Sequence, residues 1–166
     1  MKKVILTPNP YRDKNFQTVR KAVEILKNAG VDPRVCLPFE VDRSFELPRD
    51  IRFSRLDREM PNASAVICFG GDGTILRIAP DASLYRKPVL GVNCGTIGFM
   101  SEIEPEELEM VRMVKEGSFT LDDRAMLDIT VYDDLGNTKY TAIALNEAVV
   151  TKGFFNRVIP LSVIVD

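Results

Sequence analysis

Short, continuously apolar runs recur along the first part of the chain, at residues 4–6, 35–37, 65–69 and 89–92. After the first run, the apolar residues of segment 15–29 fall on one helical face, and Gly30 follows this segment. Strands that are apolar on both faces are typical of a parallel sheet with helices on each side. The pattern therefore predicts an α/β fold.

The pattern changes near residues 118–124. Before this point, residues 105–116 have the features of a helix, with Pro105 in the first turn and Gly117 after the end. After it, segments 124–134, 137–153 and 157–166 alternate apolar and polar residues, which predicts antiparallel strands with a first turn at 133–137. We expect an α/β domain at residues 1–120 and, at residues 121–166, the first strands of an incomplete, β-sandwich-like domain.

Arginines recur between the second and third apolar runs, at Arg49, Arg52, Arg55 and Arg58. Acidic residues are interleaved with them, and such a mixture is typical of a solvated, ion-paired surface segment. We assign no chemistry to residues 42–60.

Composition narrows the class of protein. The chain is 45% hydrophobic and 28% charged with a formal net charge of −2, so it is expected to be globular, with no overall attraction for nucleic acid or anionic membranes. It contains neither an apolar run long enough to span a bilayer nor an N-terminal stretch typical of a secretory signal. We therefore expect a cytoplasmic protein without nucleic-acid or membrane partners.

The residues available for chemistry are restricted. The sequence has no histidine, which excludes Ser-His-Asp and Cys-His catalysis and zinc sites that use histidine. Cys36, Cys68 and Cys94 form no C-x-x-C pair and stand in apolar or glycine-rich settings, which favours buried thiols over ligands or nucleophiles. No protein metal site is predicted, and acid–base chemistry must use carboxylates, lysine, tyrosine or water.

The stretch CFGGDGT, residues 68–74, combines glycines with one acidic residue after an apolar run. Glycines between a strand and a helix can bind phosphate, because they permit positive φ and close approach of backbone N–H groups. Gly70, Gly71 and Thr74 are the candidate phosphate loop. Asp72 would repel phosphate unless it holds a metal ion or accepts a proton from a hydroxyl that attacks that phosphate, as in phosphoryl transfer. The alternative is a tight turn in which Asp72 caps the following helix.

Two further elements carry candidate binding residues. GVNCGTIGFM, residues 91–100, follows a predicted strand and can line a nucleotide pocket with Phe99 against a base; the alternative is a packed crossing with Phe99 in the core. In ALNEAVV, residues 144–150, Asn146 and Glu147 interrupt a predicted apolar strand. Burying them is unfavourable unless they are paired or face a ligand, although an edge or bulge position is equally compatible.

These elements together resemble the NAD kinase family. GGDGT is the motif that this family shares with diacylglycerol-type lipid kinases and phosphofructokinases, so the resemblance implies a phosphofructokinase-like N-terminal domain. GVNCGTIGFM is similar to the family pattern G-x-N-x-G-x-x-G-F, and ALNEAVV is similar to its L-N-E strand. An R-x-x-L-like stretch at 124–127 lies between them, and the order and spacing of all four elements match the family.

The resemblance implies transfer of the terminal phosphoryl group of ATP or polyphosphate to the 2′-hydroxyl of the adenosine ribose of NAD, giving NADP, with Mg²⁺ present. By resemblance, Asp72 is the catalytic proton acceptor and Gly73 contacts the dinucleotide. Phe99 packs near the adenine, while Asn146 and Glu147 bind the adenosine-side ribose and base. Arg77 is a candidate phosphate contact or a solvated helix residue.

The chain departs from the family pattern at its C-terminal end, where further strands and a T-P-T-G-S-T-A-Y-like segment are absent. Two alternatives to an active NAD kinase therefore stand: a nucleotide-binding fragment with impaired catalysis, and a lipid kinase of the same superfamily. The lipid kinases typically continue GGDGT directly into an asparagine–glutamate pair, whereas Ile75 follows here. Exposed strands of a partial sandwich favour pairing with another copy, so a homo-oligomer, dimer or tetramer, is expected.

Overall fold

The computed structural model describes residues 1–42, 44–95, 98–151 and 160–165. The chain forms two compact units, Met1–Ala125 and Met126–Asp166. The first contains a parallel sheet with helices, and the second contains a small antiparallel sheet. The predicted α/β class, followed by antiparallel strands, is confirmed.

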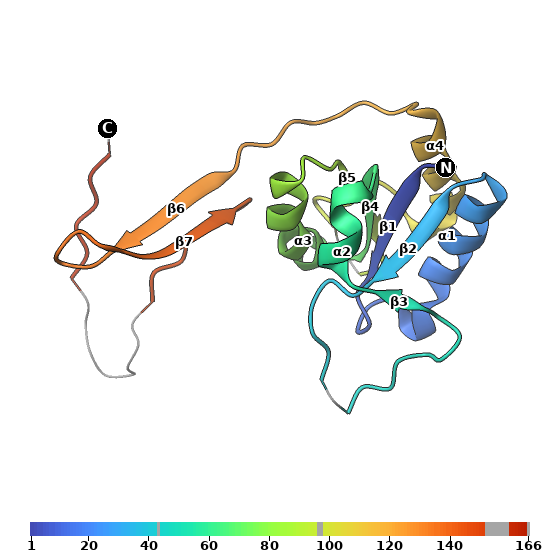
Figure 1. Cartoon of the computed structure of the whole chain (residues 1–166), viewed down its shortest axis with the longest axis horizontal. Helices are drawn as coiled ribbons and strands as arrows, with labels where there is room; N and C mark the ends of the chain where they lie inside the picture. The colour runs from blue at the N-terminus through green and yellow to red at the C-terminus, as the bar shows by residue number, and fades with distance from the viewer. Residues whose placement is uncertain (43, 96–97, 152–159, 166) are drawn as a thin grey trace. The chain divides into compact units, whose positions relative to one another are not determined.

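The sheet of the first unit has five parallel strands in the order β3-β2-β1-β4-β5 (Figure 1). They are β1 (Lys3–Pro8), β2 (Asp32–Cys36), β3 (Phe53–Ser54), β4 (Ala65–Gly70) and β5 (Val89–Asn93). The four predicted strands are confirmed, and every residue of β4 is buried. The edge strand β3, paired with Val35 and Cys36, was not predicted, because two residues are too few to show a periodic pattern.

Helices cover both faces of this sheet (Figure 1). One face packs against α1 (Gln17–Asn28), the 3₁₀ helix η3 (Pro105–Arg112) and α4 (Met113–Glu116). The other face packs against α2 (Leu56–Glu59), the 3₁₀ helix η2 (Met60–Asn62) and α3 (Asp72–Leu84). Neighbouring residues of one strand enter opposite cores, as Ile5 and Leu6 do, because strand side chains alternate in direction.

The predicted helices differ from the observed ones at two places. The first begins at Gln17 rather than at residue 15, because Asn15 and Phe16 have φ of 54° and 57°, outside the helical region. A short 3₁₀ helix, η1 (Lys14–Phe16), occupies this position. The second predicted helix, 105–116, is 3₁₀ along η3 and α-helical only in α4.

The arginine-rich segment is ion-paired where the structure records partners. Arg55 pairs with Asp57 at 2.8 Å, and Asp50 pairs with Arg20 of α1. Arg43, which lies in this segment, is outside the described residues. The interpretation as a surface segment is supported, with the addition that it contributes β3 and α2 to the domain.

The second unit contains a hairpin of β6 (Leu127–Tyr132) and β7 (Thr138–Ala144). Gly136, with φ of 81°, lies in the predicted turn, where Asp133 accepts hydrogen bonds from the backbone of Leu135 and Asn137. The predicted third strand is wrong for residues 160–165, which form no strand, and its remaining residues, 157–159 and 166, are outside the described part.

Within the described ranges, no helix combines the length and apolar character needed to cross a lipid bilayer.

Candidate functional site

The GGDGT loop connects the end of β4 to the start of α3. Gly70 is the last strand residue, Gly71 is the N-cap, and Asp72 is the first residue of the helix. The alternative that Asp72 caps this helix is wrong, since the cap position belongs to Gly71 and no side-chain cap bond forms. The first N–H groups of a helix lack partners within the helix and bind anions well, so the start of α3 can receive a phosphate.

The glycines of this loop have two different structural roles. A Cβ on Gly70 would lie 2.3 Å from Thr74 Oγ1, so close packing excludes a side chain there. A Cβ on Gly71 or Gly73 would meet no atom within 4 Å, which leaves the backbone open to a ligand. The expectation of positive φ is wrong for the loop, because among the described glycines only Gly30, Gly117 and Gly136 have it. The glycines of this loop therefore serve close approach between atoms rather than positive φ.

Asp72 joins the two glycine-containing loops. Its Oδ1 accepts a hydrogen bond from the backbone N–H of Met100 at 3.0 Å, and its Oδ2 accepts one from Phe99 at 3.2 Å. The side chain is half-buried. A carboxylate offers about four lone-pair positions, so each oxygen retains capacity for a further donor such as a substrate hydroxyl.

Residues 100–103 cross directly beside β5. A Cβ on Gly91 would lie 2.8 Å from Ser101 Cα, so only glycine permits this crossing. Asn93 fixes the start of the loop: its Oδ1 accepts the N–H of Gly95 at 3.0 Å, and its Nδ2 donates to Glu104 at 3.0 Å. Residues 96–97 of this loop lie outside the described residues.

Phe99 and Arg77 are both exposed. The side chain of Phe99 is 89% exposed, so the alternative that it belongs to the core is wrong. Arg77 lies on α3 and lines an open groove of about 660 Å³. This groove includes neither Asp72 nor Phe99 and lies beside α2, β3 and the outer side of α3; its other lining residues are Leu37, Phe39, Glu40, Phe53, Ser54, Arg55, Leu56, Asp57, Met60, Asp81, Leu84 and Tyr85.

Asn146 and Glu147 do not lie in a strand. Strand β7 ends at Ala144, and both residues are exposed in the segment that follows it. The interpretation as polar residues that interrupt an apolar strand is therefore wrong. They belong to the second unit, whereas Asp72, Gly73, Arg77 and Phe99 belong to the first.

Two of the three cysteines are buried as the sequence predicted. Cys36 and Cys68 are buried and Cys94 is half-buried, and none forms a disulfide. Burial raises the pKa of the Cys36 and Cys68 thiols to about 12 and that of Cys94 to about 11. Thiols with raised pKa values are poor nucleophiles near neutral pH, so none of the three is a candidate nucleophile.

Asn9 is a residue that the sequence analysis did not single out. It follows β1 directly, and its Nδ2 donates a hydrogen bond to Thr74 Oγ1 at 3.1 Å, across 65 residues of sequence. The available signal was the Asn9-Pro10 dipeptide after a buried strand, which marks a turn but does not indicate its partner.

Comparison with known proteins places these features in a family. A sequence model of the ATP-NAD kinase N-terminal domain matches residues 4–113. The NAD kinase of Corynebacterium diphtheriae is 38% identical over 151 residues, covering 88% of this chain and 47% of that protein. The NAD kinase of Ruminiclostridium cellulolyticum is 34% identical over 167 residues, covering 100% of this chain and 56% of that protein.

A solved structure has the same fold. The crystal structure of yeast NADH kinase complexed with NADH matches with a TM-score of 0.66 at 21% identity, covering 88% of this chain and 47% of that chain. The chain thus spans about half the length of the curated relatives that it matches.

Proposed function

Because the chain belongs to the NAD kinase family, we propose that it transfers the terminal phosphoryl group of ATP or polyphosphate to the 2′-hydroxyl of the adenosine ribose of NAD, giving NADP. The observation that carries this proposal is the position of Asp72, a carboxylate at the N-terminus of α3 and beside the open backbone of Gly71 and Gly73. A phosphate-binding helix start and a proton acceptor are the two groups that this reaction needs at one place.

In the proposed reaction Asp72 accepts the proton of the 2′-hydroxyl as that oxygen bonds to the phosphorus. The bond from the phosphorus to the leaving oxygen of the donor breaks in the same displacement. Asp72 has lone pairs left for the hydroxyl after bonding to the N–H groups of Phe99 and Met100. The two amides thus orient the carboxylate before the acceptor binds.

The binding roles follow the exposed groups around Asp72. Gly73 contacts the dinucleotide, since no atom lies within 4 Å of its missing Cβ. Phe99 packs against the adenine with its exposed ring. Gly70 and Thr74 shape the phosphate loop with Gly71, and Arg77 is the candidate cation for the phosphate tail. Asn146 and Glu147 are the candidate contacts for the adenosine-side ribose and base.

Mg²⁺ neutralises the charge on the transferring phosphoryl oxygens in such reactions. Within the described ranges, no cluster of three or more acidic or thiol side chains could hold a metal ion alone. Asp72 is the acidic residue of the GGDGT loop, and Mg²⁺ usually retains waters while binding one or two carboxylates and substrate phosphates. The site therefore fits an ion held mainly by the donor's phosphates.

The proposal includes a cytoplasmic homo-oligomer, a dimer or tetramer, without nucleic-acid partners. The hairpin of the second unit supports association, because it exposes large apolar side chains such as Tyr132 and Tyr140, each 61% exposed. Exposed strands of this kind pair readily with another chain.

The test is NADP formation by the purified 166-residue chain. NAD and NADH are offered separately as acceptors. ATP or polyphosphate is the donor, and Mg²⁺ is added. The product is measured with an NADP-specific dehydrogenase. Product that requires both a donor and Mg²⁺ supports the proposal. NAD binding without product contradicts transfer by this chain and identifies it as a nucleotide-binding fragment.

A further inference from the structure

Asn9 connects three segments of the first unit at the carboxyl end of the sheet. Its backbone N–H donates to Phe69 O at 2.8 Å, which extends the pairing of β1 with β4 by one residue. Its carbonyl oxygen accepts the N–H groups of Arg12 and Asp13 at 3.0 and 2.9 Å. Its side chain reaches Thr74 on α3 at 3.1 Å. One residue therefore holds the end of β4, the turn after β1 and the first turn of α3.

The orientation of the Asn9 side-chain amide is fixed by its two hydrogen-bond partners. Oδ1 accepts the backbone N–H of Tyr11 at 3.0 Å, and Nδ2 donates to Thr74 Oγ1. A flipped amide would place its NH₂ group against the N–H of Tyr11, two donors facing one another. The side chain is thus a directed bridge from the turn after β1 to Thr74.

Thr74 connects the Asn9 side chain to the phosphate loop. Thr74 is 2% exposed, and its backbone N–H donates to Gly71 O at 2.9 Å. A Cβ on Gly70 would lie 2.3 Å from Thr74 Oγ1 and 3.1 Å from Asn9 Cβ. Gly70, Thr74 and Asn9 therefore interlock, and a shift of Thr74 must move the backbone of residues 70–73.

We propose that Asn9 is a positioning residue that fixes the GGDGT loop through Thr74 and so sets the rate of phosphoryl transfer. The kinetic part of this proposal rests on the proposed function, but the positioning part does not. Within the described residues, the hydrogen bonds of Asn9 go to residues 11–13, 69 and 74, and none goes to the segment 98–100. Asn9 should therefore affect the placement of Asp72 and the phosphate loop more than that of the segment 98–100.

The test uses four variants that remove or keep the bridge: Asn9→Ala, Thr74→Val, the double variant and Thr74→Ser. Asn9→Ala removes the donor, Thr74→Val removes the acceptor at nearly constant shape, and Thr74→Ser keeps the acceptor oxygen. If Asn9 acts through Thr74, the double variant should be no worse than Asn9→Ala alone, because both single variants already remove the bond between Asn9 and Thr74.

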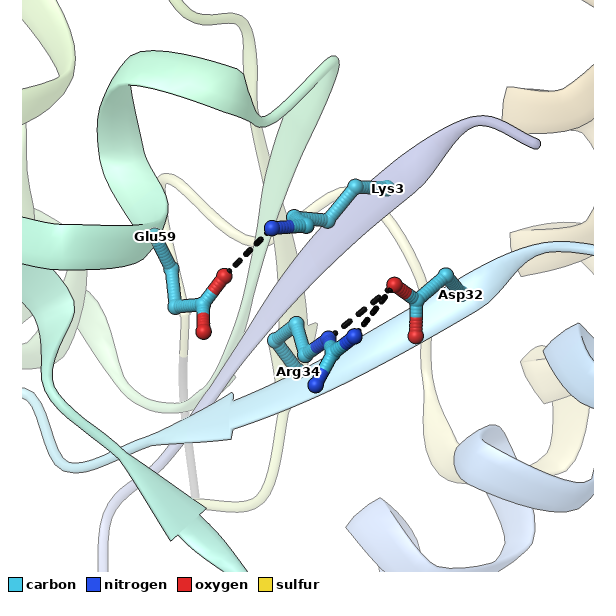
Figure 2. A network of polar contacts seen from close by, with 4 residues as sticks. All are labelled: Lys3, Asp32, Arg34 and Glu59. Atoms are coloured by element: carbon cyan, nitrogen blue, oxygen red, sulfur yellow. Dashed lines mark hydrogen bonds and ion pairs between the residues drawn. The ribbon is translucent and has the colours of Figure 1, made fainter.

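Lys3 provides the matched control. Lys3 begins β1, the strand that Asn9 follows, and its Nζ lies 2.7 Å from Glu59 Oε2 of α2 (Figure 2). The six residues of β1 separate this ion pair from the glycine loop by about 20 Å of strand. Lys3→Met therefore lowers the stability of the first unit by removing an ion pair at the opposite end of the same strand, away from the loop.

Amide hydrogen exchange tests the positioning directly and needs no activity. The reporters are the N–H of Thr74, bonded to Gly71 O, and the N–H of Cys94, bonded to Gly70 O. Asn9→Ala and Thr74→Val should accelerate the exchange of both amides about five- to tenfold relative to the amide of Val66, near the start of β4. Lys3→Met should change the exchange rates of all three amides by one common factor. If Asn9→Ala accelerated exchange at Thr74, Cys94 and Val66 by the same factor, the proposal would be overturned.

The kinetic test separates positioning from general destabilisation. For Asn9→Ala we expect kcat for NADP formation to fall about 10- to 100-fold, since small misplacements of reacting groups cost this much. The KM for NAD should change by a smaller factor than kcat, and Thr74→Ser, which keeps the acceptor oxygen, should lose less kcat than Thr74→Val. An unchanged kcat, or a fall matched by Lys3→Met, would refute the role. If the unaltered chain forms no NADP, the proposed function fails, and the exchange result alone decides for or against Asn9 as a positioning residue.

Discussion

Asp72 Oδ1 accepts a hydrogen bond from the backbone N–H of Met100 at 3.0 Å, although the two residues are 28 positions apart. With the parallel bond from Phe99 N–H to Oδ2, this contact makes the proposed proton acceptor a structural part of the second loop. In the proposed reaction the same carboxylate would accept the proton and also hold the second loop in place.

Asp72→Asn should impair both turnover and NAD binding. The amide cannot accept the hydroxyl proton, which should lower kcat by at least about 10²-fold. Its NH₂ group would also face the N–H of Phe99 or Met100, two donors in conflict, so the dissociation constant for NAD should rise. Turnover assays and calorimetric titration with NAD measure the two effects separately. Asp81→Asn, an exposed acid on the same helix, should change neither. Turnover of Asp72→Asn equal to that of the parent would refute the proton-acceptor role.

Alanine at Gly70 and at Gly73 should have opposite consequences. Gly70→Ala places a Cβ 2.3 Å from Thr74 Oγ1, and such overpacking costs about 1–3 kcal/mol of unfolding free energy. Gly73→Ala meets no atom within 4 Å, so the thermal midpoint should be unchanged while NADP formation falls, because the methyl group occupies the dinucleotide's approach. Thermal unfolding and turnover of both variants check this. Full activity of Gly73→Ala would show that no ligand uses this space.

Phe99→Ala should weaken NAD binding without affecting stability. Because the ring is 89% exposed, its loss should change the unfolding free energy by less than about 0.5 kcal/mol. A lost aromatic contact with a base is worth about 1–3 kcal/mol, so KM for NAD should rise about tenfold or more at nearly constant kcat. Leu84→Ala, at a side chain that is 68% exposed on α3, is the control. An unchanged KM would place the adenine elsewhere.

The buried thiols should make the first unit sensitive to alkaline pH. Burial raises the pKa of Cys68 from 9.0 to about 12 in the folded chain, so its neutral form is favoured there. The resulting stability is complete below pH about 9 and is lost as pH rises toward 12, because the unfolded thiol ionises first. Urea unfolding should show that the free energy of unfolding falls less between pH about 8 and about 10.5 for Cys68→Ala than for the parent. Equal losses would contradict the effect of burial at Cys68.

The strands and the glycine loop were predictable because their signals are local. Every residue of β4 is buried, which leaves a continuous apolar run in the sequence, and glycines after such a run mark a strand-to-helix turn. The edge strand β3 left no such signal, because it pairs only two residues. The placement of Asn146 and Glu147 failed for a related reason: an apolar run continues past Ala144, but strand pairing stops there.

The sequence by itself determined the α/β class and the candidate chemistry of Asp72, since these depend on residue type and periodicity, and it carries the motifs by which the chain resembles the NAD kinase family. Only the tertiary structure decided that Asp72 bonds to Met100 and that Asn9 bonds to Thr74. These contacts join residues 28 and 65 positions apart. No local pattern encodes such pairs, because they form only when parallel strands bring their carboxyl ends, and the loops that follow them, to one edge of the sheet.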